Sequence, residues 1–368
     1  MLSDPPVEPV RYDPSLERPD PDEGKTGEGL REQILRIAEI TYRDGGHAIR
    51  GVHAKSHGLL NAELIIEPGL PPVLAQGLFA QAGRYPVIMR FSTTPGDILP
   101  DSVTTPRGVA LKVFGVTGER LPDADGSTQD FVLVNGKAFG TPDARKFLAN
   151  LKLLAATTDK AEGLKKVLSG ALRGAEHVAE ALGRESPTLR RLGGYPETQI
   201  LGDSFFSQAP IRYGDYVAKI GLVPVSPELV ALTGKHLKLT GRPTGLRDSV
   251  VDFFRDHRGE WELRVQLCTN LDTMPIENAA KVWPEDQSPY LTVARLVAGP
   301  QVGWSQARAD VGDDALSFSP WHGLAAHRPL GSIMRLRKQV YEASARFRRE
   351  HNGRPLHEPQ SFAPLSDG

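Results

Sequence analysis

Short runs typical of β-strands recur along this chain of 368 residues, and they constrain its fold more than any other feature. Four runs precede a long helical segment and four follow it, and clusters of Gly and Pro separate them. They lie at residues 59–66, 86–91, 107–115, 130–135, 211–222, 249–257, 260–268 and 290–297. Asp256-His257-Arg258-Gly259 is typical of a hairpin turn between two of the later runs. This order predicts a mixed α+β protein with an antiparallel sheet or barrel.

Helices are predicted before, between and after the strand-like runs. Residues 30–42 carry apolar side chains at helical spacing. Thr141-Pro142-Asp143 is typical of a helix start, so helices are expected over about 142–183. Two further helices are expected at about 303–313 and 332–351.

We expect one domain with two appendages. Residues 1–25 are rich in Pro, Asp and Glu and are predicted to form an N-terminal arm that is loose or lies on the surface. Residues 26–351 form the domain, which includes the helical insert at about 142–183, and residues 352–368 form a C-terminal tail. A chain of this length can bury a large core in a single domain.

Charge and composition argue against several classes of protein. The chain has 44 Lys and Arg against 45 Asp and Glu, and no block of like charge suggests nucleic acid or a membrane surface. No apolar run reaches the roughly 18 residues of a membrane span. The polar segment 1–21 lacks a hydrophobic signal core, and the single Cys268 fits a reducing compartment. We therefore expect a cytoplasmic protein.

The last predicted helix carries a chemically distinctive face. A helix turns about 100° per residue, so Tyr341 lies roughly 40° from Arg337 and roughly 20° from Arg348 around the axis. A guanidinium beside a phenol favours the phenolate, which is a ligand for ferric iron, and tyrosine is a known proximal haem ligand. An ordinary Arg–Tyr pair on a helix surface is the alternative. Near the start of the chain, His53 would supply acid–base chemistry on the other side of the metal.

Seven short motifs support this interpretation because they occur in one order along the chain. They are Val52-His53-Ala54-Lys55, Met89-Arg90-Phe91-Ser92-Thr93, Pro106-Arg107-Gly108, Val134-Asn135, Lys281-Val282-Trp283-Pro284, Phe318-Ser319-Pro320 and Arg337-x-x-x-Tyr341. Together they resemble the haem catalase family over residues 50–348. The resemblance implies a closed antiparallel β-barrel with helices packed outside. Only about 27 residues follow Tyr341, so the chain resembles the small, catalase-related peroxidase branch that lacks the extra C-terminal domain.

The resemblance also implies roles for residues on the distal side of a heme b. His53 corresponds to the distal histidine, which takes a proton from the inner peroxide oxygen and returns it to the leaving oxygen. Ser92 corresponds to the serine that hydrogen-bonds this histidine and sets its tautomer. Asn135 corresponds to the asparagine that donates a hydrogen bond to the peroxide, although Asn135-Gly136 is also a good turn dipeptide.

Other residues are expected to bind the haem itself. Tyr341 would be the proximal iron ligand, with Arg337 as its neighbouring cation. Three arginines correspond to those that face the haem propionates, because a planar guanidinium binds carboxylates in a bidentate manner; they are Arg50, Arg90 and Arg348. Three apolar residues are candidates to pack near the porphyrin: Val52, Phe91 and Phe139. For Phe91 and Phe139, a place as ordinary core aromatics is the stronger alternative.

Departures from the family pattern bear on activity. Ala345 stands where large catalases have a histidine after the proximal tyrosine, and an insertion is needed around residues 121–126. The different surface segments lead us to expect no NADPH. A more open haem would admit organic hydroperoxides and reducing donors, so we predict a peroxidase that acts on peroxide and a small organic donor, with catalase turnover as well. We expect a homo-oligomer and favour a dimer.

Two alternatives remain open. One is a fatty-acid hydroperoxide isomerase similar to the allene oxide synthase relatives of catalase. Those relatives carry a threonine just before the distal histidine, whereas this chain has Val52. The other is a haem-binding protein without catalysis, for which His53, Asn135 and the Arg337–Tyr341 pair would be unnecessary.

Overall fold

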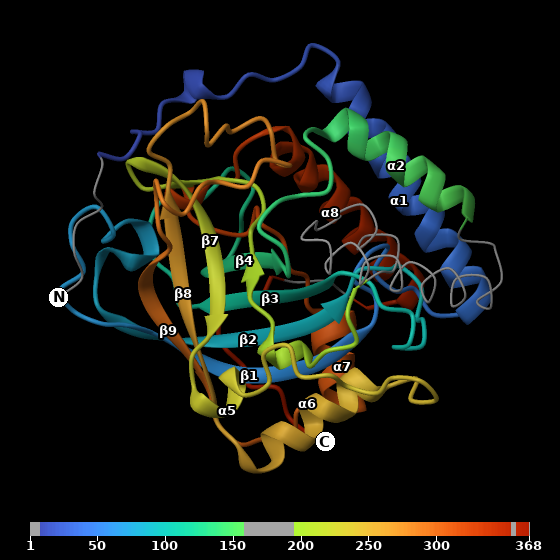
Figure 1. The fold of residues 1–368 in the computed structure, drawn as a ribbon. Coiled ribbons are helices and arrows are strands. Elements are labelled where there is room, and N and C mark those ends of the chain that lie inside the picture. Colours follow the sequence, from blue (N-terminus) through green and yellow to red (C-terminus); the bar gives the residue numbers. More distant parts are fainter. Residues whose placement is uncertain (1–7, 158–194, 355–357, 368) are drawn as a thin grey trace, which may run out of the picture.

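An antiparallel β-barrel forms the centre of the computed structural model, which describes residues 8–157, 195–354 and 358–367 (Figure 1). Its strands follow the order β5-β4-β3-β2-β1-β9-β8-β7, and pairing of β5 with β7 closes the ring. The short strand β6 also pairs with β7, beside β5. The strands are β1 (Ser56–Ile66), β2 (Gly83–Thr93), β3 (Arg107–Phe114), β4 (Thr128–Val134), β5 (Phe205–Phe206), β6 (Ile211–Tyr213), β7 (Tyr216–Pro224), β8 (Gly259–Leu267) and β9 (Leu291–Ala298).

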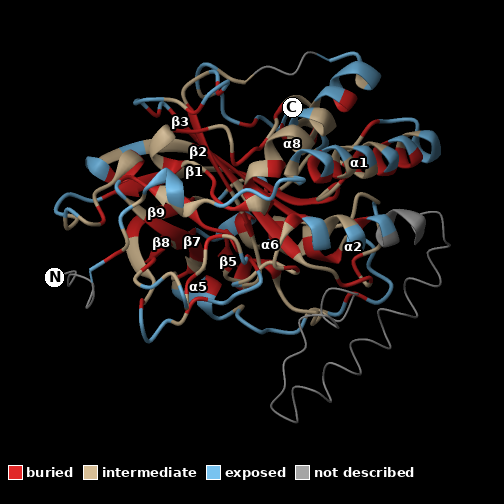
Figure 2. Cartoon of the chain, turned by 90° about the horizontal axis from the view of Figure 1, so that it is seen from above, coloured by how far each residue is buried: buried red, intermediate tan, exposed pale blue. Residues whose placement is uncertain are grey.

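The barrel has an apolar interior because successive side chains of a strand point to opposite faces. On β2, Met89 and Phe91 are fully buried in the interior cluster, whereas Arg90 and Ser92 lie on the outer face. Figure 2 shows the strands as mostly buried, while the surrounding helices alternate buried and exposed residues. This alternation places polar side chains of β2 on the barrel's outer wall, where helices cover it.

Three long helices cover one side of the barrel: α1 (Glu23–Gly45), α2 (Ala144–Thr157) and α8 (Ser332–Asn352). α1 contacts both α2 and α8, and α8 is the one that faces the outer wall of the barrel (Figure 1). Smaller helices and helical turns lie between the strands and in the segments before β1 and after β9. They are η1 (Pro14–Leu16), η2 (Gly77–Ala80), η4 (Ile200–Gly202), α5 (Pro227–Val230), α6 (Gly245–Asp256), α7 (Gln306–Ala309), η5 (Asp310–Ala315) and η6 (Ala325–His327).

A network of ion pairs fixes the start of α8. Arg335 donates hydrogen bonds of 2.6–3.0 Å to Glu17, Glu23 and Glu277. Glu277 also accepts the backbone N–H of Ser332 at 2.9 Å, so it caps the helix. Carboxylates near a helix N-terminus are stabilised by the unpaired N–H groups there. The network therefore joins the N-terminal arm, α1 and α8.

Both ends of the described chain pack on the barrel. In the arm, the backbone N–H of Val10 donates to Cys268 and that of Tyr12 to Asp215, each at 2.7 Å. In the tail, Leu365 exchanges two hydrogen bonds with Asn61 of β1. Leu365 joins an apolar cluster outside β1–β3 that also contains residues of β2, β3, α7 and the 316–318 segment.

One predicted strand is wrong, and with it the hairpin turn that was expected to follow it. Residues 249–257 were expected to form a strand but belong to helix α6, so the segment 256–259 is a helix–strand connection and not a hairpin. The buried residues Leu246, Val250 and Phe254 are spaced by four, and this helical spacing outweighs the β-branched pair Val250-Val251. The helix expected over 303–313 is present, as α7 followed directly by the π-helical η5, and together they run from residue 306 to residue 315.

The remaining predicted elements are present with shifted ends. The run at 211–222 forms β6 and β7, and the helix expected over 30–42 is the central part of α1. In the expected insert, α2 is present, while residues 158–183 lie outside the described chain. Among the described residues, no helix combines the length and the apolar character needed to cross a bilayer.

Candidate functional site

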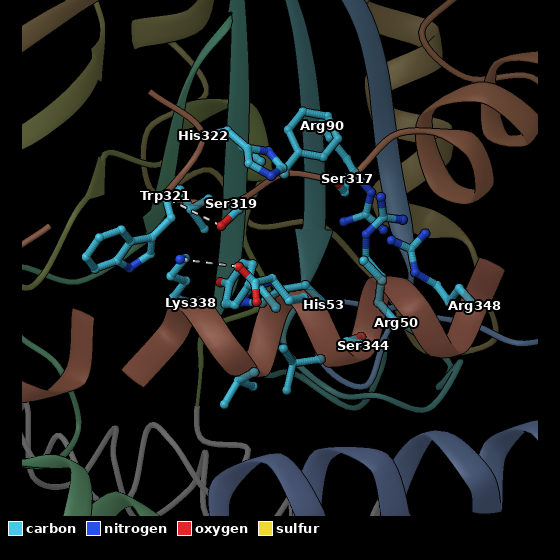
Figure 3. A pocket seen from close by; sticks show the side chains of 18 of the residues that line it. Arg50, His53, Arg90, Ser317, Ser319, Trp321, His322, Lys338, Ser344 and Arg348 are labelled. Carbon is cyan, nitrogen blue, oxygen red and sulfur yellow. Dashed lines mark hydrogen bonds and ion pairs between the residues drawn. The ribbon is translucent and has the colours of Figure 1, made fainter. Parts of the chain in front are cut away.

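A cavity of about 320 Å³ lies between the outer wall of the barrel and helix α8 (Figure 3). Its lining comes from β2, β3 and β4, from the segments 317–322 and 50–53, and from α8. Figure 3 shows Arg50, Arg90 and Arg348 together at one end and Trp321 and Lys338 at the other. The volume lies within the range of small-molecule and cofactor sites, about 300–1,000 Å³.

His53 enters the cavity from the segment that precedes β1. Its Nδ1 lies 3.0 Å from the Oγ of Ser92, so the two predicted partners are in contact. The backbone of His53 has a left-handed φ of 53°, and its N–H donates to the carbonyl of Thr94 at 2.7 Å. Non-glycine residues adopt this conformation at a cost of order 1–3 kcal/mol, which the surrounding contacts must offset.

The His53 ring is held neutral. Burial, followed by the nearby positive charges of Arg90, Arg337 and Arg50, lowers the pKa of His53 to about 3. The ring also lies directly against β3, because a Cβ at Gly108 would come within 2.7 Å of its Cε1. Only glycine permits this approach. The site therefore presents an unprotonated imidazole, oriented by Ser92, at physiological pH.

Three arginines converge at one end of the cavity around a single carboxylate. Arg90 Nε donates to Asp313 Oδ1 at 2.6 Å, Arg50 lies 3.5 Å from the same oxygen, and Arg348 donates to the Asp313 carbonyl at 2.6 Å. Burial and the positive charge of Arg90 lower the pKa of Arg348 to about 10. The Nε of Arg348 is buried and has no hydrogen-bond partner among the described residues. This end of the cavity thus carries unpaired cationic donors.

Tyr341 lines the cavity from α8, and its hydroxyl has no hydrogen-bond partner within the described chain. Arg337 lies one turn earlier but does not line the cavity. Its guanidinium lies 3.3 Å from the sulfur of Met334 and 5.7 Å above the ring of Phe139. Within the described chain no hydrogen bond joins Arg337 to Tyr341, although the two residues lie one turn apart on α8.

Besides Arg337, three predicted site residues lie away from the cavity lining. Asn135 accepts the backbone N–H of Arg107 at 2.8 Å and donates to Asp203 at 3.0 Å. Phe91 points into the barrel, against Phe205 and Trp261, because it lies on the opposite face of β2 from Arg90. Phe139 packs on Phe147 and under Arg337. Val52, in contrast, lines the cavity as expected.

The inserted segment at 121–126 closes the end of the cavity away from the arginines. Pro122 and Asp123 line the cavity, and Asp123 Oδ2 lies 2.6 Å from the Nζ of Lys338 on α8. Asp123 also has a left-handed φ of 63°. The insertion therefore contributes a wall and a salt bridge to α8.

A buried ion cluster that sequence reasoning missed lies beside the cavity. Lys112 Nζ is 2.9 Å from both carboxylate oxygens of Asp130 and also contacts Glu358, and His322 Nδ1 lies 3.2 Å from Asp130 and 3.0 Å from Glu358. Burial lowers the pKa of His322, but hydrogen bonds to the two carboxylates outweigh it and raise that pKa to about 9. Asp130, His322 and Glu358 are close enough together to hold a metal ion. The Lys112 ammonium and the protonated His322 ring together balance the two carboxylates, which argues for a salt-bridge cluster and against a metal.

The fold is that of the catalases. A fungal catalase has a TM-score of 0.58 and 17% identity, covering 84% of this chain and 61% of its own. Catalase A from Saccharomyces cerevisiae has a TM-score of 0.57 and 15% identity, covering 84% and 63%. A bacterial catalase has a TM-score of 0.55 and 17% identity, covering 97% and 68%. This chain has the catalase fold.

The likeness is structural and covers part of those proteins. The chain spans about three fifths of the length of the fungal and yeast catalases. No protein-family model matches the sequence, and no curated protein matches it.

The residues of the cavity fit a haem. Ala110, Val132 and Phe318, of which the first two lie on the same sheet face as Arg90, offer apolar walls, as a porphyrin ring requires. The three arginines and Asp313 leave an excess of two positive charges, which matches the two carboxylates of a haem. The buried Nε of Arg348 is unpaired among the described residues, which points to an acceptor that they do not supply.

Proposed function

We propose that the protein is a haem-dependent peroxidase/catalase. It would cleave hydrogen peroxide or organic hydroperoxides and oxidise a small organic donor, with heme b as its cofactor. The observation that carries this proposal is that one cavity contains the His53–Ser92 pair, the Tyr341 phenol and the arginine cluster. The same proposal includes a cytoplasmic location and a homodimer.

The residues divide the work between holding the cofactor and moving protons. Tyr341 would ligate the iron, and Arg50, Arg90 and Arg348 would bind the two carboxylates. When bound, the haem would supply the iron that exchanges electrons with peroxide. Arg337 would add positive charge on the tyrosine side.

His53 would act as the acid–base group. Because its imidazole is neutral, it can accept the proton of the peroxide oxygen nearer the metal. It would then return this proton to the outer oxygen, which leaves as water or, from an organic hydroperoxide, as an alcohol. Ser92 would hold the ring in one orientation during both transfers. Asn135 is left out of this mechanism because its amide is engaged by Arg107 and Asp203.

The openness of the cavity favours the peroxidase side of the proposal. Glu342, Arg346 and Arg349 line the cavity and are exposed to solvent. A donor molecule can therefore approach the site from solution, whereas a narrow channel would exclude it. No observation favours the isomerase alternative, since Val52 at the cavity leaves the position before His53 without a hydroxyl.

The test uses haem-loaded protein in an oxygen electrode, with donor oxidation followed optically. Hydrogen peroxide and an organic hydroperoxide are each added with and without the donor. We expect little oxygen and fast donor oxidation, most clearly with the organic hydroperoxide. Rapid oxygen release that the donor barely changes would identify a catalase. Neither signal in protein that holds haem would reject the proposal in favour of an isomerase or a haem-binding protein.

A further inference from the structure

Asp313 occupies the centre of the arginine cluster and is fixed on both carboxylate oxygens. Its Oδ1 accepts from Arg90 Nε at 2.6 Å, and its Oδ2 accepts from the hydroxyl of Ser56 at 2.6 Å. Ser56 in turn accepts from the indole N–H of Trp304 at 2.9 Å. Burial raises the pKa of Asp313, but the charges of Arg90 and Arg50 outweigh it and hold that pKa below its usual range. The side chain is thus an ionised, immobilised anion.

The turn that contains Asp313 holds each arginine from one side. Arg50 donates to the carbonyls of Gly312, Asp313 and Leu316 at 2.5–3.0 Å. Arg348 donates from Nη1 to the carbonyl of Asp313. Arg90 is held through Nε by the Asp313 carboxylate and through Nη2 by the carbonyl of Ala54 at 3.1 Å.

Each guanidinium keeps at least one nitrogen free on its other side. Within the described chain, Arg90 Nη1, Arg50 Nε and the Nε and Nη2 of Arg348 have no hydrogen-bond partner. All three arginines line the cavity, and Figure 3 shows them grouped at one end of it. Arg90 and Arg348 are only 2% and 3% exposed, so their mutual repulsion is weakly screened.

We propose that Asp313 is a positioning residue that orients Arg90 and keeps the arginine cluster together, so that its free N–H groups meet the two carboxylates of the haem. This inference rests on the proposed haem function. Removing the carboxylate would leave Arg90 without its Nε partner and three buried cations without a central anion. The cluster would then spread, and recognition of carboxylates would weaken more than binding of the porphyrin ring.

The test compares two probes, haem with free carboxylates and its dimethyl ester, titrated into haem-free protein and followed by absorbance. The wild type should prefer the free acid. In Asp313→Asn this preference should fall by roughly 10- to 100-fold, the usual effect of removing a supporting partner of a binding group. Ser56→Ala, which releases the second carboxylate oxygen of Asp313, should shift the preference in the same direction by less.

Asp314→Asn is the matched control, because it removes one negative charge from the same turn. Asp314 pairs with the half-exposed His47 at 3.0 Å and does not touch Arg90. We expect the preference of Asp314→Asn for the free acid over the ester to differ from that of the wild type by less than about fivefold. Equal losses in both variants would show a general charge effect and overturn the positioning role.

Other outcomes separate this inference from the function on which it rests. If folded Asp313→Asn and Ser56→Ala both prefer the free acid over the ester as strongly as the wild type does, the inference is rejected while the haem function stays intact. Equal wild-type affinity for both probes would reject carboxylate recognition by the arginines, and with it the role of Asp313. Wild-type protein that binds neither probe would reject the haem function itself.

Discussion

At the scale of single residues, His53 has the most constrained surroundings in the site. A left-handed backbone, the hydroxyl of Ser92 and the flat wall at Gly108 fix its ring, and three arginines disfavour its protonation. The same ring in water would be protonated below about pH 6.5. Its neutral state at lower pH is therefore a product of the fold.

The first prediction concerns this protonation state. The rate constant for peroxide cleavage should stay level between pH 5 and 8 and fall only as the pH approaches about 3, where His53 gains a proton. His53→Gln should keep haem but lose roughly 10²–10⁴-fold in rate. Stopped-flow measurements check both points. The control is His257→Gln, because His257 is exposed and lies outside the cavity. An inflection near pH 6.5 in the wild type would contradict the neutral His53.

Tyr341 allows a second prediction. If its phenol ligates iron, Tyr341→Phe should change the visible spectrum of the haem-loaded protein or lose the haem. Tyr42→Phe on α1 is the control, because Tyr42 packs on Phe347 outside the cavity lining. A wild-type spectrum in Tyr341→Phe would exclude ligation.

Sequence patterns located some of these residues and misplaced others. The family resemblance brought His53 and Ser92 together, and they lie in contact. Phe91 was placed at the cofactor beside Arg90, although neighbours on a strand face opposite sides. Asp313 left no signal, because its partner Arg90 lies 223 residues away in the chain.

At the scale of elements, α8 carries most of the proposed cofactor contacts and depends on its N-terminal anchor. Tyr341 and Arg348 can occupy their positions only if α8 keeps its rotation about its axis and its position along that axis relative to the barrel. Arg335, whose side chain is 12% exposed, supplies that anchor through three glutamates from other parts of the chain.

A third prediction follows for Arg335→Ala. The substitution leaves Glu17, Glu23 and Glu277 close together without a cation, so the free energy of unfolding should fall by roughly 3 kcal/mol or more. Urea unfolding of the haem-free protein measures this loss. Arg349→Ala, an exposed arginine on the same helix, should change the free energy by less than about 0.5 kcal/mol. A loss in Arg335→Ala no larger than this would show that α8 does not need the anchor.

Element boundaries show where local patterns mislead. The Val250-Val251 and Phe253-Phe254 pairs resemble a strand, yet the segment is helix α6. Val250 and Phe254 are fully buried while Val251 and Phe253 are only partly buried, so the four-residue spacing of the buried set decides. Burial, which a sequence does not display directly, separates the two interpretations.

At the scale of the whole molecule, closure of the barrel buries several ionisable groups. His327 is 1% exposed and accepts the backbone N–H of Leu78 at 2.9 Å, which requires a neutral ring. Burial lowers its pKa to about 3, and burial also lowers the pKa of His57 well below its usual value. Both histidines therefore bind a proton more readily in the unfolded chain than in the folded protein.

The last prediction is that stability declines in acid. Unfolded His327 binds a proton below about pH 6.5, whereas the folded residue does so only near pH 3, so the unfolded state binds more protons between these values. The free energy of unfolding should therefore fall as the pH drops through this window, by up to about 1.4 kcal/mol per pH unit for this histidine. Urea unfolding at several pH values tests it, and His327→Gln should have a shallower slope. Equal slopes in the two proteins would contradict the assignment.

The sequence by itself determined the strand and helix periods, the helix face with Arg337, Tyr341 and Arg348, and the order of the family motifs. These depend on spacing along the chain, which local geometry converts directly into faces. Only the tertiary structure decided which face of β2 lines the cavity, where Asn135 and Phe139 point, and which carboxylates balance the buried cations. Contacts such as Arg90–Asp313 and Lys112–Glu358 join residues 223 and 246 positions apart. Charge pairing of this kind depends on burial, and burial exists only once the barrel and α8 have packed together.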